Sequence, residues 1–511
     1  TTPGFADAYR RFREDGWTSL GAPEEFGGQG LPLLLSAAVT EMWGGANLAF
    51  AMCPEVAVGA IEALRAHAPQ ELRETYLPRL VSGEWTASMA LTEPQAGSDL
   101  STLRTRAEPD GTAWRLFGRK IYISWGDHDM AENIVHLVLA RAPDAPAGTK
   151  GLSLFLVPKF VPAADGTLVR NDVHAVSLEH KMGIRASPTC VLALGDAEGA
   201  RGWLVGRLHE GLACMFTMMN HMRLGVGLHS TGLAERACQL ALSHARERLQ
   251  GRDARGEQRP IIEHADVRRM LLTMRALTHA ARCLAYTAAA AIDVAHGAPD
   301  EAVRAAAERR ASLLTPVVKA WCSETAVEVA SLGVQVHGGA GFIDDAEISQ
   351  VYRDARIGPI FEGTNYIQAQ DLLGRKIVRD GGRELEALIT EMEAAAQALS
   401  AEEHALARLR DGLLDGCARL RAAATELVSR AAKDTELVGA TAYHFLHWLG
   451  VLAGGWQWAL AARRAVEDAD THSRSVVQLA AFYAAHVLPR AAVHEAIVLG
   501  GAEAIAQAEL A

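Results

Sequence analysis

The sequence predicts a mainly helical protein with a β domain near its middle. The chain has 511 residues, 49% of them hydrophobic and 22% charged, which allows roughly three domain-sized units with a sizeable core. Apolar residues recur at helical spacing before residue 86 and after residue 211, whereas short runs of branched residues fill the stretch between. The expected parts are N-terminal helices (1–85), a β domain (86–211), a helix bundle (212–380) and an extra helical domain (385–511).

The first part contains two clear helical patterns. "FADAYRRFREDG" is amphipathic and closes on Gly16, and "LPLLLSAAVTEMWGGANLAFAM" is more apolar, as expected of a helix buried on most sides. The β domain is predicted from "WRLFGRKIYIS", "NIVHLVLAR", "GLSLFLVPK" and "TCVLAL", separated by turn formers such as "EPDGT" and "GDAEGARG". A small barrel or sandwich is expected there.

Long helices return after the β domain. "GLHSTGLAERACQLALSHARERL", "HADVRRMLLTMRALTHAARCLAYTAAAAIDVAH" and "TPVVKAWCSETAVEVASLGVQVH" have the spacing of a four-helix bundle. The last part is rich in Ala and Leu and acidic. Its stretch Val438–Ala462 has no charged residue and is long enough to span a bilayer. Interruptions by His444, His447 and three glycines favour buried core helices over a membrane span.

Charge and cysteine content narrow the class of protein. The net charge of −11 argues against a protein that wraps a nucleic-acid duplex, which needs basic surface. Seven dispersed cysteines without a CxxC predict reduced thiols, no zinc site and a cytoplasmic protein. The opening residues show no signal-peptide pattern, consistent with that location.

Two segments of the β domain carry polar groups in irregular settings. In "ALTEPQAGSDLST", residues 90–102, Pro94 and Gly97 break the regular backbone, which predicts either a polar turn or a loop whose hydroxyls face a planar ligand. In "KIYISWGDHD", residues 120–129, Tyr122 and Ser124 either pack in a strand or line the edge of an aromatic cofactor. For Trp125 we expect ordinary packing.

Two further segments follow a long helix. The glycines of "QVHGGAGF", residues 335–342, either allow close approach of a ligand or cap the helix through Gly338 or Gly339. No strand precedes them and GxGxxG is absent, so a Rossmann site is not indicated. "IFEGTN", residues 360–365, places one acid, Glu362, between Phe361 and Gly363, at a break before a helix that Thr364 or Asn365 can cap. Taken alone, the segment favours a solvated acid near a helix N-terminus, where the helix dipole tolerates a negative charge.

Taken together, these segments resemble the flavin-dependent acyl-CoA dehydrogenases. The family's two signatures and its base motif look like "ALTEPQAGSD", "QVHGGAGFIDD" with a later "RD", and "FEGT", and the resemblance covers about residues 5–380. The chain departs from the signatures at Thr102 and Gln350. "EHKMGIRASPT" and "MFTMMNHMRLGVGLHSTGL" look most like the methylmercaptopropionyl-CoA dehydrogenase branch, which also has a C-terminal helical extension.

The resemblance implies an activity and assigns roles. It implies removal of the α-proton and β-hydride of an acyl-CoA to give the trans-2-enoyl-CoA, with Glu362 as base and FAD as hydride acceptor. A rival base position used by some members is Met222 here, which supports Glu362. Substrate contacts are expected from Ser98, Asn220, Arg223 and Gly363. The expected FAD contacts are Leu91, Thr92, Ser98, Tyr122, Ser124, Arg248, Gln250, Gln335, Gly339, Thr364 and Tyr366.

The resemblance also implies partners. An electron-transfer flavoprotein would accept the electrons, and Arg248 would reach FAD in a partner subunit, so a homodimer or dimer of dimers is expected. The acyl group stays open, with 3-methylmercaptopropionyl-CoA and short or medium chains as candidates. Three alternatives remain: an acyl-CoA oxidase, a non-catalytic relative that binds nucleic acid, and a membrane-associated long-chain dehydrogenase. The acidic C-terminal part and the presence of Glu362 argue against the second.

Overall fold

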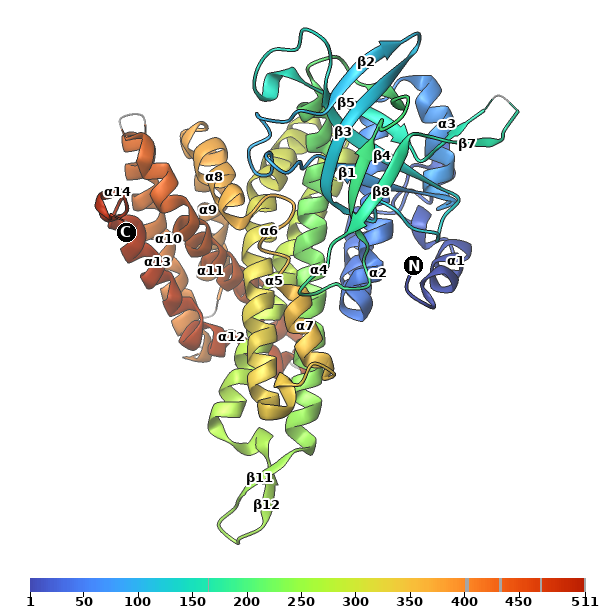
Figure 1. Ribbon diagram of the computed structural model, residues 1–511. Helices are drawn as coiled ribbons and strands as arrows, with labels where there is room; N and C mark the ends of the chain where they lie inside the picture. The colour runs from blue at the N-terminus through green and yellow to red at the C-terminus, as the bar shows by residue number, and fades with distance from the viewer. Residues whose placement is uncertain (164, 400–403, 432–433, 469–470, 510–511) are drawn as a thin grey trace. The chain divides into compact units, whose positions relative to one another are not determined.

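The order of helices, β domain and helices follows the prediction (Figure 1). The computed structural model describes residues 1–511 apart from 164, 400–403, 432–433, 469–470 and 510–511. The chain forms two compact units. The first contains residues 1–36 and 47–222, and the second contains residues 37–46 and 223–511.

Three helices open the chain: α1 (Phe5–Glu14), α2 (Leu33–His67) and α3 (Gln70–Val81). The apolar pattern predicts α2 as one helix, and the structure adds a kink at Asn47, whose φ of −162° and ψ of 94° are not helical. The side-chain oxygen of Asn47 accepts a hydrogen bond from the Phe50 amide at 3.1 Å. Asn47 therefore caps the second half of α2, as a short polar side chain does at a helix N-terminus.

The β domain is built on one eight-stranded sheet in the order β1-β4-β5-β10-β3-β9-β8, with β2 paired to β3 and β4. Strands β6 and β7 form a separate two-stranded sheet. The strands are β1 (Trp85–Ala90), β2 (Arg106–Asp110), β3 (Ala113–Ser124), β4 (Asn133–Arg141), β5 (Leu152–Pro158), β6 (Phe160–Pro162), β7 (Leu168–Arg170), β8 (Val173–Leu178), β9 (Thr189–Leu194) and β10 (Ala200–Val205).

Strand β4 is buried on both faces because it divides two cores. Val135 and Leu137 pack in a cluster with residues of α2, α3 and the start of α4 (Gly211–Glu247). Val138 and Ala140 point the other way, into a cluster built from strands of the sheet. Since side chains alternate along a strand, one continuous apolar run can serve both cores.

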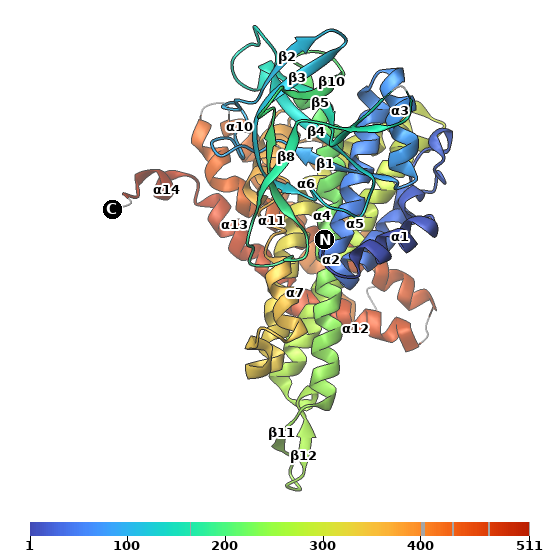
Figure 2. The ribbon, with the colours of Figure 1, turned by 45° about the vertical axis from the view of Figure 1, so that its right-hand side comes forward.

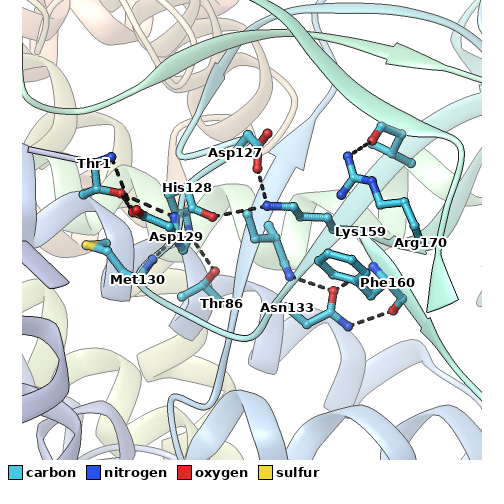
Figure 3. A network of polar contacts seen from close by, with 12 residues as sticks. Thr1, Thr86, Asp127, His128, Asp129, Met130, Asn133, Lys159, Phe160 and Arg170 are labelled. Atoms are coloured by element: carbon cyan, nitrogen blue, oxygen red, sulfur yellow. Dashed lines mark hydrogen bonds and ion pairs between the residues drawn. The ribbon is translucent and has the colours of Figure 1, made fainter. Parts of the chain in front are cut away.

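A polar network fixes the turn that follows β3 (Figure 3). Lys159 pairs with Asp127 at 2.5 Å, and the Thr86 hydroxyl lies 2.8 Å from Nε2 of His128. Burial lowers the pKa of His128 to about 4, with a smaller contribution from the charge of Lys159, so its ring is neutral at physiological pH. Asn133 exchanges two hydrogen bonds with the backbone of Phe160, at 2.8 and 2.9 Å. The turn is thus held to β1 and to the β5–β6 connection.

The second unit contains the predicted bundle. Its helix α6 begins under an Asp300 cap and continues through Pro316, although the sequence pattern for this helix starts only at Thr315. A proline inside a helix costs about 3 kcal/mol, which burial of the flanking residues Leu314 and Val317 offsets. Besides the later part of α4, the bundle contains α5 (Ala265–Gly297), α6 (Glu301–His337), α7 (Glu347–Ala355), α8 (Asn365–Gln370) and the π-helical η6 (Asp371–Val378).

The C-terminal helices pack directly on this bundle. Trp321 of α6 lies against Gly450 and Gly454 of α11 (Thr435–Asp468), where an added Cβ would come within 2.5 and 2.9 Å of the Trp321 ring. The Trp458 indole donates to the Ala276 carbonyl at 3.1 Å. The uncharged stretch of the sequence is therefore a core helix of this unit. The C-terminal helices are α9 (Arg383–Gln397), α10 (His404–Ala431), α11 (Thr435–Asp468), α12 (Thr471–His486), α13 (Ala491–Leu499) and α14 (Glu503–Gln507).

Two other stretches of the described chain are long and apolar enough to cross a membrane by length and composition alone. They are Leu33–His67, in which 78% of the apolar 18-residue segment is buried, and Ser473–Leu499, in which 39% of that segment is buried. A buried core helix of a soluble protein passes the same test, so these two stretches give weak evidence for a membrane span.

A hairpin projects from the end of the bundle. Strands β11 (Leu249–Arg252) and β12 (Gln258–Pro260) join α4 to α5 and extend beyond the ends of both helices (Figure 1; Figure 2). The rings of His244 and His337 stack at 4.3 Å, which ties the ends of α4 and α6 together. The 3-10 segment η5 (Gly338–Phe342) follows α6 and leaves Phe342 87% exposed.

Candidate active site

The acid of the "FEGT" segment occupies a strained turn in the second unit. Glu362 has φ +58°, in the left-handed region that residues with a side chain rarely adopt. Its Oε2 is buried and has no hydrogen-bond partner among the described residues. A strained backbone and an unpartnered buried carboxyl oxygen each cost free energy, on the order of 1–3 kcal/mol. Such features concentrate where function requires them.

The turn is held by hydrogen bonds on both sides of Glu362. The Asn365 amide donates to the Pro359 carbonyl at 3.0 Å, which closes the loop across the acid. The Gln368 side chain donates to the carbonyls of Glu362 and Gly363, both at 3.2 Å. Gly363 has φ +79°, a backbone conformation in which a residue with a side chain would be strained, and a Cβ there would also displace Nε2 of Gln368. The Thr364 hydroxyl caps α8, as the sequence predicts.

Two buried cations accompany Glu362. Burial raises the pKa of Glu362 to about 7, against the opposing charges of Lys319 and, more weakly, Arg223. Lys319 is fully buried and donates to Oδ1 of Asn365 at 2.9 Å; burial lowers its pKa to about 7, against the favourable charge of Glu362. A carboxyl group with a pKa near neutral can both take and release a proton at physiological pH.

The structure buries Arg223 and pairs it with an acid. Its guanidinium lies 3.3 Å from Asp371, and the residue is 4% exposed. Arg223 is therefore a buried, paired cation and not a surface charge. Asn220 lies one turn earlier on α4 and is exposed. Tyr366 is exposed on α8, and its hydroxyl donates to the Gly439 carbonyl of α11 at 3.1 Å.

The first unit brings together the residues predicted around the planar ligand. The Ile121 amide donates to the Thr92 carbonyl at 2.9 Å, so the loop after β1 lies beside β3. A bulge between Lys120 and Ile123 interrupts the β3–β9 ladder and gives Tyr122 a φ of +59°. Tyr122 is 61% exposed, and Ser124 is partly exposed. Trp125 is fully buried and donates to the Ala49 carbonyl, which confirms its expected packing role.

A buried ion pair supports that loop. Nζ of Lys120 donates to the Leu91 carbonyl and to Oε1 of Glu93, both at 2.9 Å. Glu93 also accepts hydrogen bonds from the amides of Arg104 and Thr105 and from the Thr105 hydroxyl. Burial opposes ionisation of Glu93, but Lys120 and these donors outweigh it and lower its pKa to about 2. The pair therefore fixes the backbone at Leu91.

The remaining predicted residues gather at the far end of the bundle in the second unit. Arg248 and Gln250 are exposed at the base of the β11–β12 hairpin, and Gln335 and Gly339 are exposed at the end of α6. Gly338 is the C-cap of α6, which confirms one of the two functions considered for these glycines. Along α6, His337 at this end lies 18 residues after Lys319, or about 27 Å.

Sequence reasoning missed three of the charged residues in these two places. Lys319 is a single lysine in the apolar run "LLTPVVKAWC", and a lone charge on a buried helix could have signalled a paired acid. Glu93 and Lys120 lie 27 residues apart, and no local pattern connects them. Asn365 was considered only as a helix cap, whereas its side chain bonds to Lys319, Ser323 and Glu324 of α6.

Comparison with known families covers nearly the whole chain. Acyl-CoA dehydrogenase models match the N-terminal domain at residues 2–84, the middle domain at 88–197 and the C-terminal domain at 209–377. A further model, described as acetyl-CoA dehydrogenase C-terminal like, matches residues 388–509. The order along the chain of N-terminal helices, β domain and C-terminal helices is thus that of a flavoenzyme that oxidises acyl-CoA.

Individual relatives and solved structures lead to the same family as these models. The chain is 48% identical over 465 residues to 3-methylmercaptopropionyl-CoA dehydrogenase of Ruegeria pomeroyi, covering 90% of this chain and 78% of the relative. It is 36% identical over 522 residues to a broad-specificity linear acyl-CoA dehydrogenase of Mycobacterium tuberculosis, covering 95% and 83%. An acyl-CoA dehydrogenase from Bacillus anthracis, crystallised with FAD, superposes with a TM-score of 0.81 at 25% identity, covering 99% and 84%. The chain belongs to the acyl-CoA dehydrogenase family.

The protein is an FAD-dependent oxidoreductase of this family, and the residues present fit the cofactor. The hydroxyls of Thr92, Ser98 and Ser124 have no hydrogen-bond partner among the described residues. They lie on the loop and strand that Lys120 and Ile121 hold together, beside the exposed ring of Tyr122. Unused donors next to an exposed aromatic ring suit a planar polar ligand such as a flavin ring.

Proposed function

We propose that this protein catalyses α,β-dehydrogenation of an acyl-CoA thioester to the trans-2-enoyl-CoA, with Glu362 as the base that takes the α-proton. The observation that carries the proposal is the buried, unpartnered Oε2 of Glu362 in a strained and well-held turn. The α-proton of a thioester is weakly acidic, so its removal needs a base at hydrogen-bond distance. Bound FAD supplies the acceptor for the β-hydride.

The residues around Glu362 divide the remaining work. Burial of the carboxyl group disfavours its charge and so strengthens it as a base. Lys319 and Arg223 are positive charges near this carboxyl group, and they oppose the effect of burial. We assign Asn220, Arg223, Ser98 and Gly363 to substrate contacts. Thr364 and Tyr366 follow the base in sequence and are assigned to the cofactor.

We further propose that the hairpin arm serves a partner subunit. Arg248 and Gln250 lie at an end of the bundle about 27 Å along α6 from Lys319, too far for direct contacts to one flavin ring beside Glu362. The exposed Phe342 and Ile343 at the same end would lose apolar exposure in a homodimer or dimer of dimers. An electron-transfer flavoprotein is the proposed electron acceptor. Seven free thiols support a cytoplasmic location.

The substrate proposed first is 3-methylmercaptopropionyl-CoA, with short and medium linear acyl-CoAs as the alternative. Support comes from the 48% identity to the enzyme of that name. The test is anaerobic titration of the FAD-loaded protein with methylmercaptopropionyl-, butyryl-, octanoyl- and palmitoyl-CoA, followed by bleaching of the flavin's visible band. Bleaching by one chain class identifies the substrate. A flavin that none of them reduces would contradict the proposed function, and oxygen consumption during turnover would indicate an oxidase instead.

A further inference from the structure

Lys319 is a buried cation near the base, and no signature of the sequence assigns a role to this lysine. It is fully buried in the middle of α6, and its ammonium makes one hydrogen bond within the described chain, to Oδ1 of Asn365 at 2.9 Å. An ammonium has three donors, so two remain unused there. A buried charge is costly unless an opposite charge compensates it, yet no carboxylate among the described residues forms an ion pair with Lys319.

Asn365 connects this lysine to the catalytic turn. Its backbone amide donates to the Pro359 carbonyl, on the other side of Glu362, and its side chain bonds to Ser323 and Glu324 of α6 at 3.1 Å each. The loop that carries Glu362 is therefore fastened to the turn of α6 that carries Lys319. Lys319 and Glu362 are thus held by the same asparagine, and their charges act on each other.

The other cation near Glu362 is already paired. Arg223 lies 3.3 Å from Asp371, which Arg375 approaches at 3.7 Å, so the charge of Arg223 is largely offset. Within the described part of the chain, the other acid whose charge acts on Lys319 is Glu324. Its Oε1 accepts from Asn365 and, at 3.5 Å, from Tyr443 of α11. Of the two cations, Lys319 therefore has the larger effect on Glu362.

We propose that Lys319 is a positioning residue for the base: fastened through Asn365 to the loop of Glu362, its buried ammonium favours the ionised form of that carboxyl group in the resting enzyme. This inference rests on the proposed function, because it presumes that Glu362 must be ionised to act. Burial alone would leave the acid protonated at neutral pH and unable to accept a proton. Lys319 offsets part of that effect and leaves a base that is ready to react near pH 7.

Two substitutions separate the charge of Lys319 from its hydrogen bond. Lys319→Met removes both, whereas Lys319→Gln removes the charge and keeps a donor that can reach toward Asn365. Lys376→Met is the matched control, because Lys376 also donates to α6, at Ser312, about 10 Å along the helix from Lys319. The protonated carboxyl group of Glu362 is followed by its infrared absorption against pH, with Glu362→Gln as the blank. The pH dependence of kcat is measured alongside.

In the wild type the infrared titration should have its midpoint near pH 7. In both Lys319 variants the midpoint, and the rising limb of kcat, should move upward by about one pH unit or more, because an opposite charge close by lowers a carboxyl pKa by about 1–3 units. The Lys376 variant should titrate like the wild type. Titration midpoints that stay at the wild-type value in folded Lys319 variants overturn the proposal. Loss of folding in both Lys319 variants also overturns it, because either result makes Lys319 purely structural.

The infrared measurement needs no turnover, which separates this inference from the proposed function. A protein that no acyl-CoA reduces, but whose Glu362 titration moves with Lys319, would remove the proposed function and keep the charge coupling. A protein that turns over normally, with an unmoved titration in the Lys319 variants, would do the reverse.

Discussion

Removing the buried Lys120 should destabilise the first unit and weaken FAD binding. In Lys120→Met the Leu91 carbonyl loses a donor and Glu93 keeps a buried negative charge without its cation. Breaking one side of a buried pair typically costs about 3–5 kcal/mol. With a urea dependence of about 1–3 kcal/mol per molar, the midpoint of unfolding should fall by on the order of 2 M.

The neighbouring residue on the same strand provides the control for Lys120. Arg119 pairs with Asp196 at 3.2 Å, and both side chains are about half exposed. Because surface pairs contribute about 0–1 kcal/mol, Arg119→Met should move the midpoint little. Unfolding in urea is followed by tryptophan fluorescence, and FAD affinity by quenching of the flavin's own fluorescence. Equal midpoints for the two variants would refute the assignment of Lys120 as the support of the cofactor loop.

Two further predictions concern the second unit. The kcat of the wild type should rise with pH through about 7, because Glu362 must lose a proton to act as a base and burial raises its pKa to that value. A kcat independent of pH between about 5 and 9 would contradict this assignment. Ending the chain at residue 380 should give insoluble protein, because it uncovers Trp321 and the α5 surface that Trp458 contacts. Gly454→Val crowds Trp321 and the Tyr483 hydroxyl. This variant should stay soluble but have a lower melting temperature than the wild type. A truncated protein that stays soluble and fully active would contradict the packing role of the C-terminal helices.

The sequence predicted the fold class because the period of its apolar residues changes twice. The strands with continuous branched runs, such as β4 and β5, are buried on both faces and were recognisable. The short strands β6, which is partly buried, and β7, which is exposed, gave no such signal. The start of α6 was missed because Pro316 resembles a helix beginning, and only tertiary burial explains why the helix continues through it.

The candidate site was predictable where its residues are close in sequence. Glu362, Gly363 and Thr364 form one short motif, and the structure places all three in the same held turn. Lys319 lies 43 residues earlier and reaches that turn only because α6 and α8 pack together. Long-range pairs of this kind follow from tertiary packing, which a local pattern does not record.

The central claim is that Glu362 removes the α-proton, and single-turnover reduction of the flavin tests it most directly. Wild type and Glu362→Gln, both loaded with FAD, are mixed anaerobically with the acyl-CoA that bleaches the wild type, and the rate of bleaching is recorded. Glutamine fills the same space but is not a base, so the rate should fall by on the order of 10²- to 10⁴-fold while FAD stays bound. A Glu362→Gln variant that reduces its flavin within a few-fold of the wild-type rate would show that another group is the base.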